Sequence, residues 1–241
     1  EQAARAYTNF SEAAIVFKEF ELAERLLAEG LAFYARHDLA WSHQLVGRQA
    51  QLRMEQGRFR EAVTIAKGVI ALERPTLVMK LPALTVLAIV HTRLGEPDSP
   101  SLLDQALRDA MTTGEPQNII PVRFGLLEAA LLNEDMLRAH DQLRVIAGMN
   151  LEGFDPWEFG TLACWWRRAS MPGQAPAGPD RLPAPRAAEL AGDFETAAEL
   201  WIKLGQPYEA ALSLAHASDG QAGTAIARAV EMLDQMEARP A

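Results

Sequence analysis

The sequence is poor in cysteine and has no long apolar run. Cys164 is the single cysteine among 241 residues, so an internal disulfide is excluded and a reducing compartment is favoured. No apolar run approaches the roughly 18 residues that a membrane-spanning helix needs. The N-terminal residues also lack the basic and apolar regions of a secretory signal. We therefore expect a soluble, cytoplasmic protein that does not bind membranes.

Positive charge is also scarce. The chain has 23 Lys and Arg against 32 Asp and Glu, a net charge of −9, and its longest basic run is Arg167-Arg168. Contacts to nucleic-acid phosphates require clustered basic side chains, so we expect no direct contact between this segment and nucleic acid. Only four basic residues are lysines, which together with the high alanine content indicates a GC-rich bacterial genome.

Motifs that carry a reaction are absent. Neither G-x-G-x-x-G nor G-x-x-x-x-G-K-[ST] occurs, so no phosphate-binding loop is present. The five histidines are scattered, without the i,i+4 pairing or the cysteine partners of a zinc site. We therefore predict no enzymatic activity, no cofactor and no metal site.

Cys164 lies in an apolar segment that ends in two tryptophans. A thiol buried in such a segment is inert, so we predict no catalytic role for it. Adjacent residues of a helix point about 100° apart. We therefore expect at least one of Trp165 and Trp166 to pack in the core rather than bind a ligand.

The apolar residues are spaced as in helices almost everywhere. In one segment Leu22, Leu26, Leu27, Leu31 and Tyr34 recur at steps of three and four residues. Alternating segments typical of strands, bounded by turn residues, are absent. The pattern predicts an all-α protein.

Five short motifs divide the helical stripes into antiparallel pairs. Each motif joins a tight turn to an aromatic or large apolar residue and then to an alanine three positions later, because two helices approach closely only where the side chain at their crossing is small. The period approaches the tetratricopeptide length of about 34 residues and predicts TPR-like hairpins in a right-handed superhelix, an α-α solenoid. The anchors are Ala23, Ala62, Ala106, Ala139 and Ala197, at spacings of 39, 44, 33 and 58 residues.

We divide the chain by repeat type into residues 1–150, with four TPR-like hairpins, and residues 151–241, with C-terminal helical repeats. In the first region Ser99 is predicted to cap a helix that has Pro100 in its first turn. In the second, Asp155 and Glu158 predict a helix that begins with a capping box. Five prolines and two glycines between residues 171 and 185 predict an exposed, mobile loop. Helices are expected after it at 184–191, 195–204, 207–217 and 222–237.

The C-terminal region resembles a known family. The run 190–212 reads LAGDFETAAELWIKLGQPYEAAL, and the chain ends in ARPA at 238–241. Both resemble the region ahead of the DNA-binding domain in LuxR-type regulators that carry a MalT-like ATPase of the STAND class. Phe194 stands where the family usually has Trp, and residues 235–237 stand where Leu-Gly is common. The resemblance covers residues of roughly 155–241, including the tryptophan-containing helix and the proline-rich connection, whereas residues 1–150 match only as generic TPR-like hairpins.

The resemblance implies an ATPase with a P-loop upstream and a helix-turn-helix downstream. This chain contains neither, so no residue in it is assigned to ATP or DNA. It also begins without an initiator methionine, directly in a helical pattern. We expect a fragment of a longer regulator, acting as a non-catalytic scaffold that binds a protein or small-molecule effector and relays its occupancy to the ATPase and DNA-binding modules.

The candidate binding residues lie on the first helix of the first two hairpins, which lines the concave face of such arrays. The simpler interpretation is that they are only solvated. The alternative function is a stand-alone adaptor that grips an extended peptide or a C-terminal carboxylate, since Asn9 and Arg48 occupy comparable positions. The lack of lysines nearby counts against it, because a carboxylate clamp needs several converging donors. The six candidates are Arg5, Asn9, Glu12, Gln44, Arg48 and Gln51.

Overall fold

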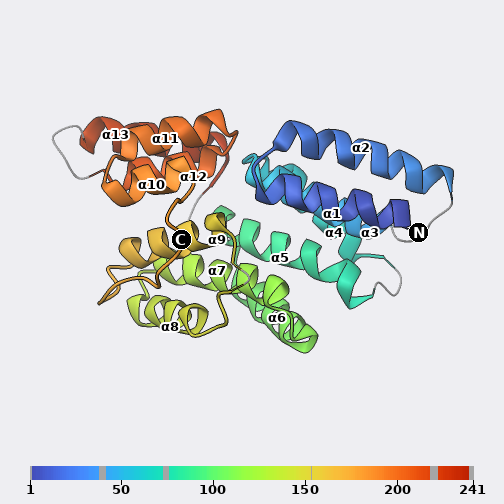
Figure 1. Cartoon of the computed structure of the whole chain (residues 1–241), viewed down its shortest axis with the longest axis horizontal. Helices are drawn as coiled ribbons and strands as arrows, with labels where there is room; N and C mark the ends of the chain where they lie inside the picture. Colours follow the sequence, from blue (N-terminus) through green and yellow to red (C-terminus); the bar gives the residue numbers. More distant parts are fainter. Residues whose placement is uncertain (1, 38–41, 73–75, 153, 218–221, 239–241) are drawn as a thin grey trace. The chain divides into compact units, whose positions relative to one another are not determined.

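The computed structural model describes residues 2–37, 42–72, 76–152, 154–217 and 222–238. Within these ranges the chain forms 13 helices and no strand (Figure 1), so the all-α prediction is confirmed. The chain divides into two compact units, Glu1–Gly125 and Leu126–Ala241. The division at residue 150, which rests on repeat type, stays a prediction.

The first unit begins with three helix pairs, and the boundary between the units falls inside α7. From α1 to α6 consecutive helices pack against each other, and α1 with α3 and α3 with α5 pack as neighbours across successive pairs. This sequential packing is that of a helical-repeat solenoid. The helices are α1 (Gln2–Val16), α2 (Phe20–Arg36), α3 (Ser42–Glu55), α4 (Phe59–Ile70), α5 (Leu77–Leu94), α6 (Ser99–Thr113) and α7 (Pro116–Leu132).

The second unit continues with shorter helices. Here α9 packs on α10, α10 on α11, α11 on α12 and α12 on α13. The last four helices begin and end within two residues of the predicted bounds. The helices are α8 (Met136–Ala147), α9 (Pro156–Arg168), α10 (Ala184–Ala191), α11 (Phe194–Lys203), α12 (Pro207–Ala215) and α13 (Ala222–Gln235).

All five predicted turn motifs contain a residue with left-handed backbone geometry. Lys18, Gly57, Gly95, Glu134 and Gly192 have φ values of 63°, 72°, 69°, 56° and 86°. The residue after each donates its backbone N–H to a carbonyl five residues earlier, as in a Schellman motif, which satisfies carbonyls that the helix end leaves unpaired. The five anchor alanines that follow these turns are all completely buried.

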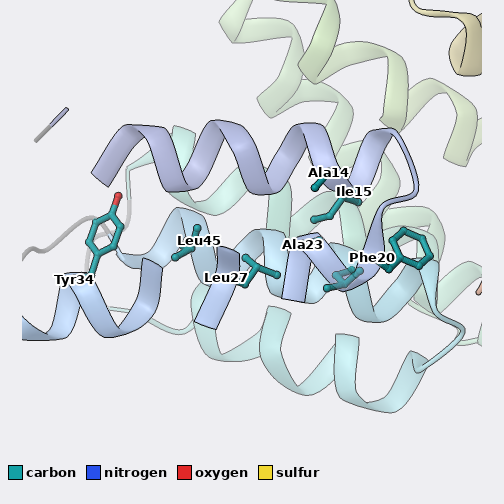
Figure 2. Packing of buried hydrophobic residues seen from close by; sticks show 8 residues of the cluster. Ala14, Ile15, Phe20, Ala23, Leu27, Tyr34 and Leu45 are labelled. Atoms are coloured by element: carbon teal, nitrogen blue, oxygen red, sulfur yellow. The ribbon is translucent and has the colours of Figure 1, made fainter. Parts of the chain in front are cut away.

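The core of the first unit shows how closely its helices approach. Ile15 of α1, Leu27 of α2 and Leu45 of α3 are almost completely buried and meet in one cluster (Figure 2). A Cβ added at Gly30 would lie 2.6 Å from Cδ2 of Leu45 and 3.0 Å from Cβ of Tyr7. The absence of a side chain at Gly30 therefore permits this crossing of α2 over its neighbours.

One of the predicted helix caps is confirmed and one is wrong. In α9 the backbone N–H groups of Trp157 and Glu158 donate to Asp155 Oδ1 at 2.7 and 2.9 Å, and the N–H of Asp155 donates to Glu158 Oε2 at 3.1 Å. In α6, however, the N-cap residue is Asp98 rather than Ser99. Asp98 makes no side-chain cap bond because its carboxylate lies 2.5 Å from Nδ1 of His91, a contact between residues seven apart that the local pattern does not show.

The proline-rich segment is free of helix from residue 169 to residue 183 and is mostly exposed, as predicted. It ends earlier than expected, because Pro185 is buried in the first turn of α10. The segment also contacts α9: Trp166 Nε1 donates to the carbonyl of Gly173 at 3.3 Å, and a Cβ at Gly178 would lie 3.0 Å from the Phe159 ring.

Candidate functional site

Three of the six candidate residues meet where α1 and α3 pack together. Arg48 of α3 forms an ion pair with Glu12 of α1, and its Nη1 donates to Gln51 Oε1 at 2.9 Å. The three side chains therefore connect the first hairpin to the second. We name the six candidates on these two helices the α1/α3 face.

The α1/α3 face repeats with the period of the hairpins. Arg5, Asn9 and Glu12 have the same spacing on α1 as Gln44, Arg48 and Gln51 on α3, and the offset of 39 residues equals the spacing of the anchors Ala23 and Ala62. Arg5 and Asn9 are exposed and Gln44 is half-buried, and these three do not join the network around Arg48. The structure thus joins half of the candidates directly and places the others one or two helical turns away.

Arg48 is only partly available to a partner. Its side chain is 20% exposed and that of Glu12 is 37% exposed. Burial lowers the pKa of the Arg48 guanidinium, while the charge and hydrogen bond of Glu12 act in the opposite direction. Because a guanidinium has five donors, Arg48 can hold Glu12 and Gln51 and still donate to a third group.

The α1/α3 face does not continue onto the third hairpin. The spacing of 44 residues between the second and third anchors places Ala88 and Thr92 of α5 at the positions of Gln44 and Arg48. Both are buried, and Thr92 Oγ1 donates to the carbonyl of Ala88 at 2.9 Å. Every residue from 83 to 92 is buried, which is typical of a helix packed on all sides.

The structure places Cys164 and the two tryptophans as expected. Cys164 is 1% exposed, and burial raises the pKa of its thiol to about 12 despite the opposing charge of Arg186. A thiol with this pKa carries almost no thiolate near neutral pH, so it is a poor nucleophile. Trp165 is buried, and Trp166 is half-buried.

The second unit contains a buried group of charges that sequence reasoning missed. Arg168 Nη2 lies 2.6 Å from Glu189 Oε1, and Arg186 Nη1 lies 2.9 Å from Glu209 Oε2. The side chains of Arg168, Arg186 and Glu189 are each at most 5% exposed. The Arg168–Glu209 and Arg186–Glu189 approaches, at 3.8 and 3.6 Å, close the group. We name these four residues the arginine–glutamate cluster.

The cluster combines residues of three helices, which explains why the sequence did not show it. Arg168 ends α9, Arg186 and Glu189 lie on α10, and Glu209 lies in the first turn of α12. The partial signals were the Arg167-Arg168 pair and the charged residues of α10 at i,i+3 spacing. Nothing local indicates that these groups are buried together, since charged residues are usually solvated.

The carboxylates of the cluster favour the charged form of Arg186. Burial opposes the charged state of Arg186, but the negative charges of Glu209 and Glu189 raise the pKa of its guanidinium above the ordinary value. Two arginines facing two glutamates leave no net charge, so the cluster offers no surplus charge for binding an ion.

Neither a metal site nor a known relative assigns a function to the described part of the chain. Within the described ranges no group of His, Cys, Asp or Glu side chains is arranged to hold a metal ion. None of the helices described combines the length and apolar character required to cross a bilayer. No protein-family model, curated protein or solved structure matches the chain.

Proposed function

We propose that the chain is the non-catalytic helical-repeat segment of a LuxR-type, ATP-dependent transcriptional regulator and that it binds an effector or protein partner. The helical-repeat architecture supports a scaffold, because stacked hairpins present side chains of equivalent positions on one continuous surface. The motifs of residues 190–212 and 238–241 remain the reason for naming this family.

The observation that carries the proposed binding site is the contact of Arg48 with Glu12 and Gln51. This contact joins two hairpins, so a partner that engages Arg48 also changes how α1 and α3 are held together. Such a coupling gives a binding event a structural consequence beyond the site itself, which a sensor requires.

The alternative, a stand-alone adaptor that clamps a C-terminal carboxylate, is supported less well. An incoming carboxylate would compete with Glu12, which already holds Arg48. A clamp of that kind needs several free donors, and Gln51 occupies a further donor of the same guanidinium.

Arg48→Gln in the full-length protein tests the site. It removes the ion pair with Glu12 but keeps a hydrogen-bonding side chain, so the fold should persist while the response of transcription to effector falls at least tenfold. The matched control is Arg25→Gln on the exposed surface of α2. An unchanged response of the Arg48 variant would refute the site.

The reading frame around the chain tests the family. A P-loop upstream and a helix-turn-helix downstream would support the regulator, whereas stop codons close to both ends would support the adaptor.

A further inference from the structure

Helices α10–α13 have an apolar core of their own. The core residues come from α11, α12 and α13, and consecutive helices of this set pack against each other. These helices, Ala184–Gln235, are here named the C-terminal block. The block can keep its shape through internal contacts. Its core residues are Ala198, Trp201, Ala210, Ala211, Leu214, Ala225 and Ala229.

Several contacts between α9 and the C-terminal block are polar. Besides the arginine–glutamate cluster, Arg186 Nη2 donates to Thr161 Oγ1 at 3.1 Å, and Arg167 Nη1 donates to the carbonyl of Leu190 at 2.7 Å. Trp157 of α9 also packs against the apolar core of the block, and its ring centroid lies 5.8 Å from that of Trp201.

A second polar contact joins the block to α7. The hydroxyl of Tyr208 in α12 donates to Glu128 Oε1 at 2.6 Å, and both residues are 4% exposed. Eighty residues of sequence separate them. The block is thus attached at two places by directional polar contacts that are made only when it is docked.

The buried charges between α9 and the C-terminal block contribute little net stability to the docked state. Burying an ion pair removes both ions from water, and this desolvation offsets much of their attraction. In addition, Arg168 Nε and Nη1, Arg186 Nε and Trp201 Nε1 are buried without a hydrogen-bond partner. Water would hydrate the arginine groups if the block separated from α9, which lowers the free-energy cost of opening.

Each of the two arginines also lies close to an aromatic ring. The Arg168 guanidinium lies 4.7 Å from the ring centroid of Trp165, and the Arg186 guanidinium lies 4.6 Å from that of Trp201. Arg168 and Trp165 both belong to α9, and Arg186 and Trp201 both belong to the block, so release breaks neither contact. The contacts do not replace the missing hydrogen bonds.

The chain connection allows the block to move away without unfolding. Residues 169–183 link α9 to α10 and contain no helix. We infer that the C-terminal block is released from α9 as an intact unit and that the arginine–glutamate cluster is the clasp that holds it. Release of this kind is a sub-global opening, which costs less free energy than unfolding of the block itself. A partner or neighbouring module that binds only one of the two states would shift the population between them.

Cys164 provides a probe of the released state. Its Sγ lies 3.9 Å from the carbonyl oxygen of Arg186, so separation of α10 from α9 exposes it. In the docked state it is 1% exposed and its pKa is about 12, so a maleimide reacts only after opening. The rate of Cys164 modification therefore reports release, and hydrogen exchange of α11–α13 reports whether the block stays folded.

Glu189→Gln is the first test. It leaves Arg168 without its nearest carboxylate in the docked state, while the released state hydrates both groups. Removing the charge of one partner of a buried ion pair shifts the equilibrium strongly from the docked to the released state. Cys164 should therefore react on the order of 100-fold faster. Amide protection in α11–α13 should stay at the wild-type level. The control is Glu199→Gln, the same change at an exposed position of α11.

The double variant Arg168→Met with Glu189→Met tests whether the charge is responsible. It removes both charges and leaves apolar side chains of similar size, so Cys164 modification should return to within a few-fold of the wild-type rate. If Cys164 in the double variant reacted as fast as in Glu189→Gln, the inference that the arginine–glutamate cluster holds the block on α9 would be wrong.

Two further results would overturn the inference. In the first, the Glu189→Gln and Glu199→Gln proteins react with the maleimide at equal rates. In the second, amides of α11–α13 exchange as fast as Cys164 reacts, in the variant or already in the wild-type protein, which would mean that the block unfolds instead of detaching.

Discussion

The two compact units use charge differently. The first has 14 Lys and Arg and 15 Asp and Glu, whereas the second has 9 and 17, so almost the whole net charge of −9 belongs to the second unit. Part of this excess consists of N-cap residues. Asp135, Asp155 and Asp193 accept backbone N–H groups at the starts of α8, α9 and α11.

The helices of the first unit whose N-cap residues are described begin without such bonds. Glu19, Arg58 and Thr76 are the N-caps of α2, α4 and α5, and none makes a side-chain cap bond. Its helices have 12 to 18 residues, whereas α8–α13 have 8 to 14. Short helices are marginal by themselves and bury fewer side chains. The comparison indicates that the second unit depends more on caps and buried polar contacts, and the first on apolar packing.

One of the two largest expected effects concerns a buried tyrosine. Tyr208→Phe removes the hydroxyl that donates to buried Glu128 and should lower the free energy of unfolding by about 1–3 kcal/mol, since a buried acceptor loses a donor. Tyr34→Phe in the first unit, also buried but with an apolar neighbourhood, should change it by less than about 0.5 kcal/mol. Urea denaturation measures both, and equal effects would contradict the proposed difference between the units.

The second prediction tests the apolar packing of the first unit. Ala62 is completely buried at the crossing of α3 and α4, so Ala62→Leu should overpack it and destabilise the protein by about 1–3 kcal/mol. Ala177→Leu, at an exposed position of the proline-rich segment, should have almost no effect. Hydrogen exchange should show the loosening in α3–α5, and wild-type melting temperatures for both variants would mean that the crossing is not tightly packed.

The third prediction compares helix caps. Asp155→Ala removes an acceptor of two backbone N–H groups and should cost about 1 kcal/mol. Thr76→Ala, at the N-cap of α5, removes no cap bond and should cost much less. Thermal denaturation measures the loss of stability in both variants. If Thr76→Ala lost more than Asp155→Ala, the first unit would also depend on its caps.

The smallest expected effect is a gain of stability at two turns. Glu134 has a φ of 56°, where glycine avoids the strain of a side chain, so Glu134→Gly should stabilise the protein by about 0.5–1 kcal/mol. Lys18→Gly relieves the same strain at a φ of 63° but loses the contact of Lys18 Nζ with Glu55 at 3.0 Å, so its gain should be smaller. Chemical denaturation that ranks Lys18→Gly above Glu134→Gly would show that this contact contributes nothing.

Local features explain why much of the fold could be predicted. The period of the apolar residues, the left-handed turn residues and the anchor alanines act over one or two helical turns, and all five anchors are buried as expected. The shifted cap of α6 shows where local reasoning ends. Asp98 takes the N-cap position while its carboxylate contacts His91 of the preceding helix, so the predicted role of Ser99 is lost.

The candidate site also has one part that the sequence showed and another that only the structure showed. Asn9 and Arg48 occupy equivalent helix positions, which the repeat period of 39 residues shows directly. Only the structure shows that Arg48 is engaged by Glu12. It also shows that Thr92, the residue of the third hairpin equivalent to Asn9 and Arg48, is buried. The α1/α3 face therefore stops after two hairpins.

The sequence by itself thus determined the helices, their turns and the small residues at their crossings, because these depend on backbone geometry and on spacing along one chain segment. Tertiary structure decided which polar side chains meet. Arg168, Glu189 and Glu209 come from three helices, and Tyr208 reaches Glu128 over 80 residues of sequence. Each of these groups would be solvated in an isolated helix, and its burial follows only from the way the helices stack.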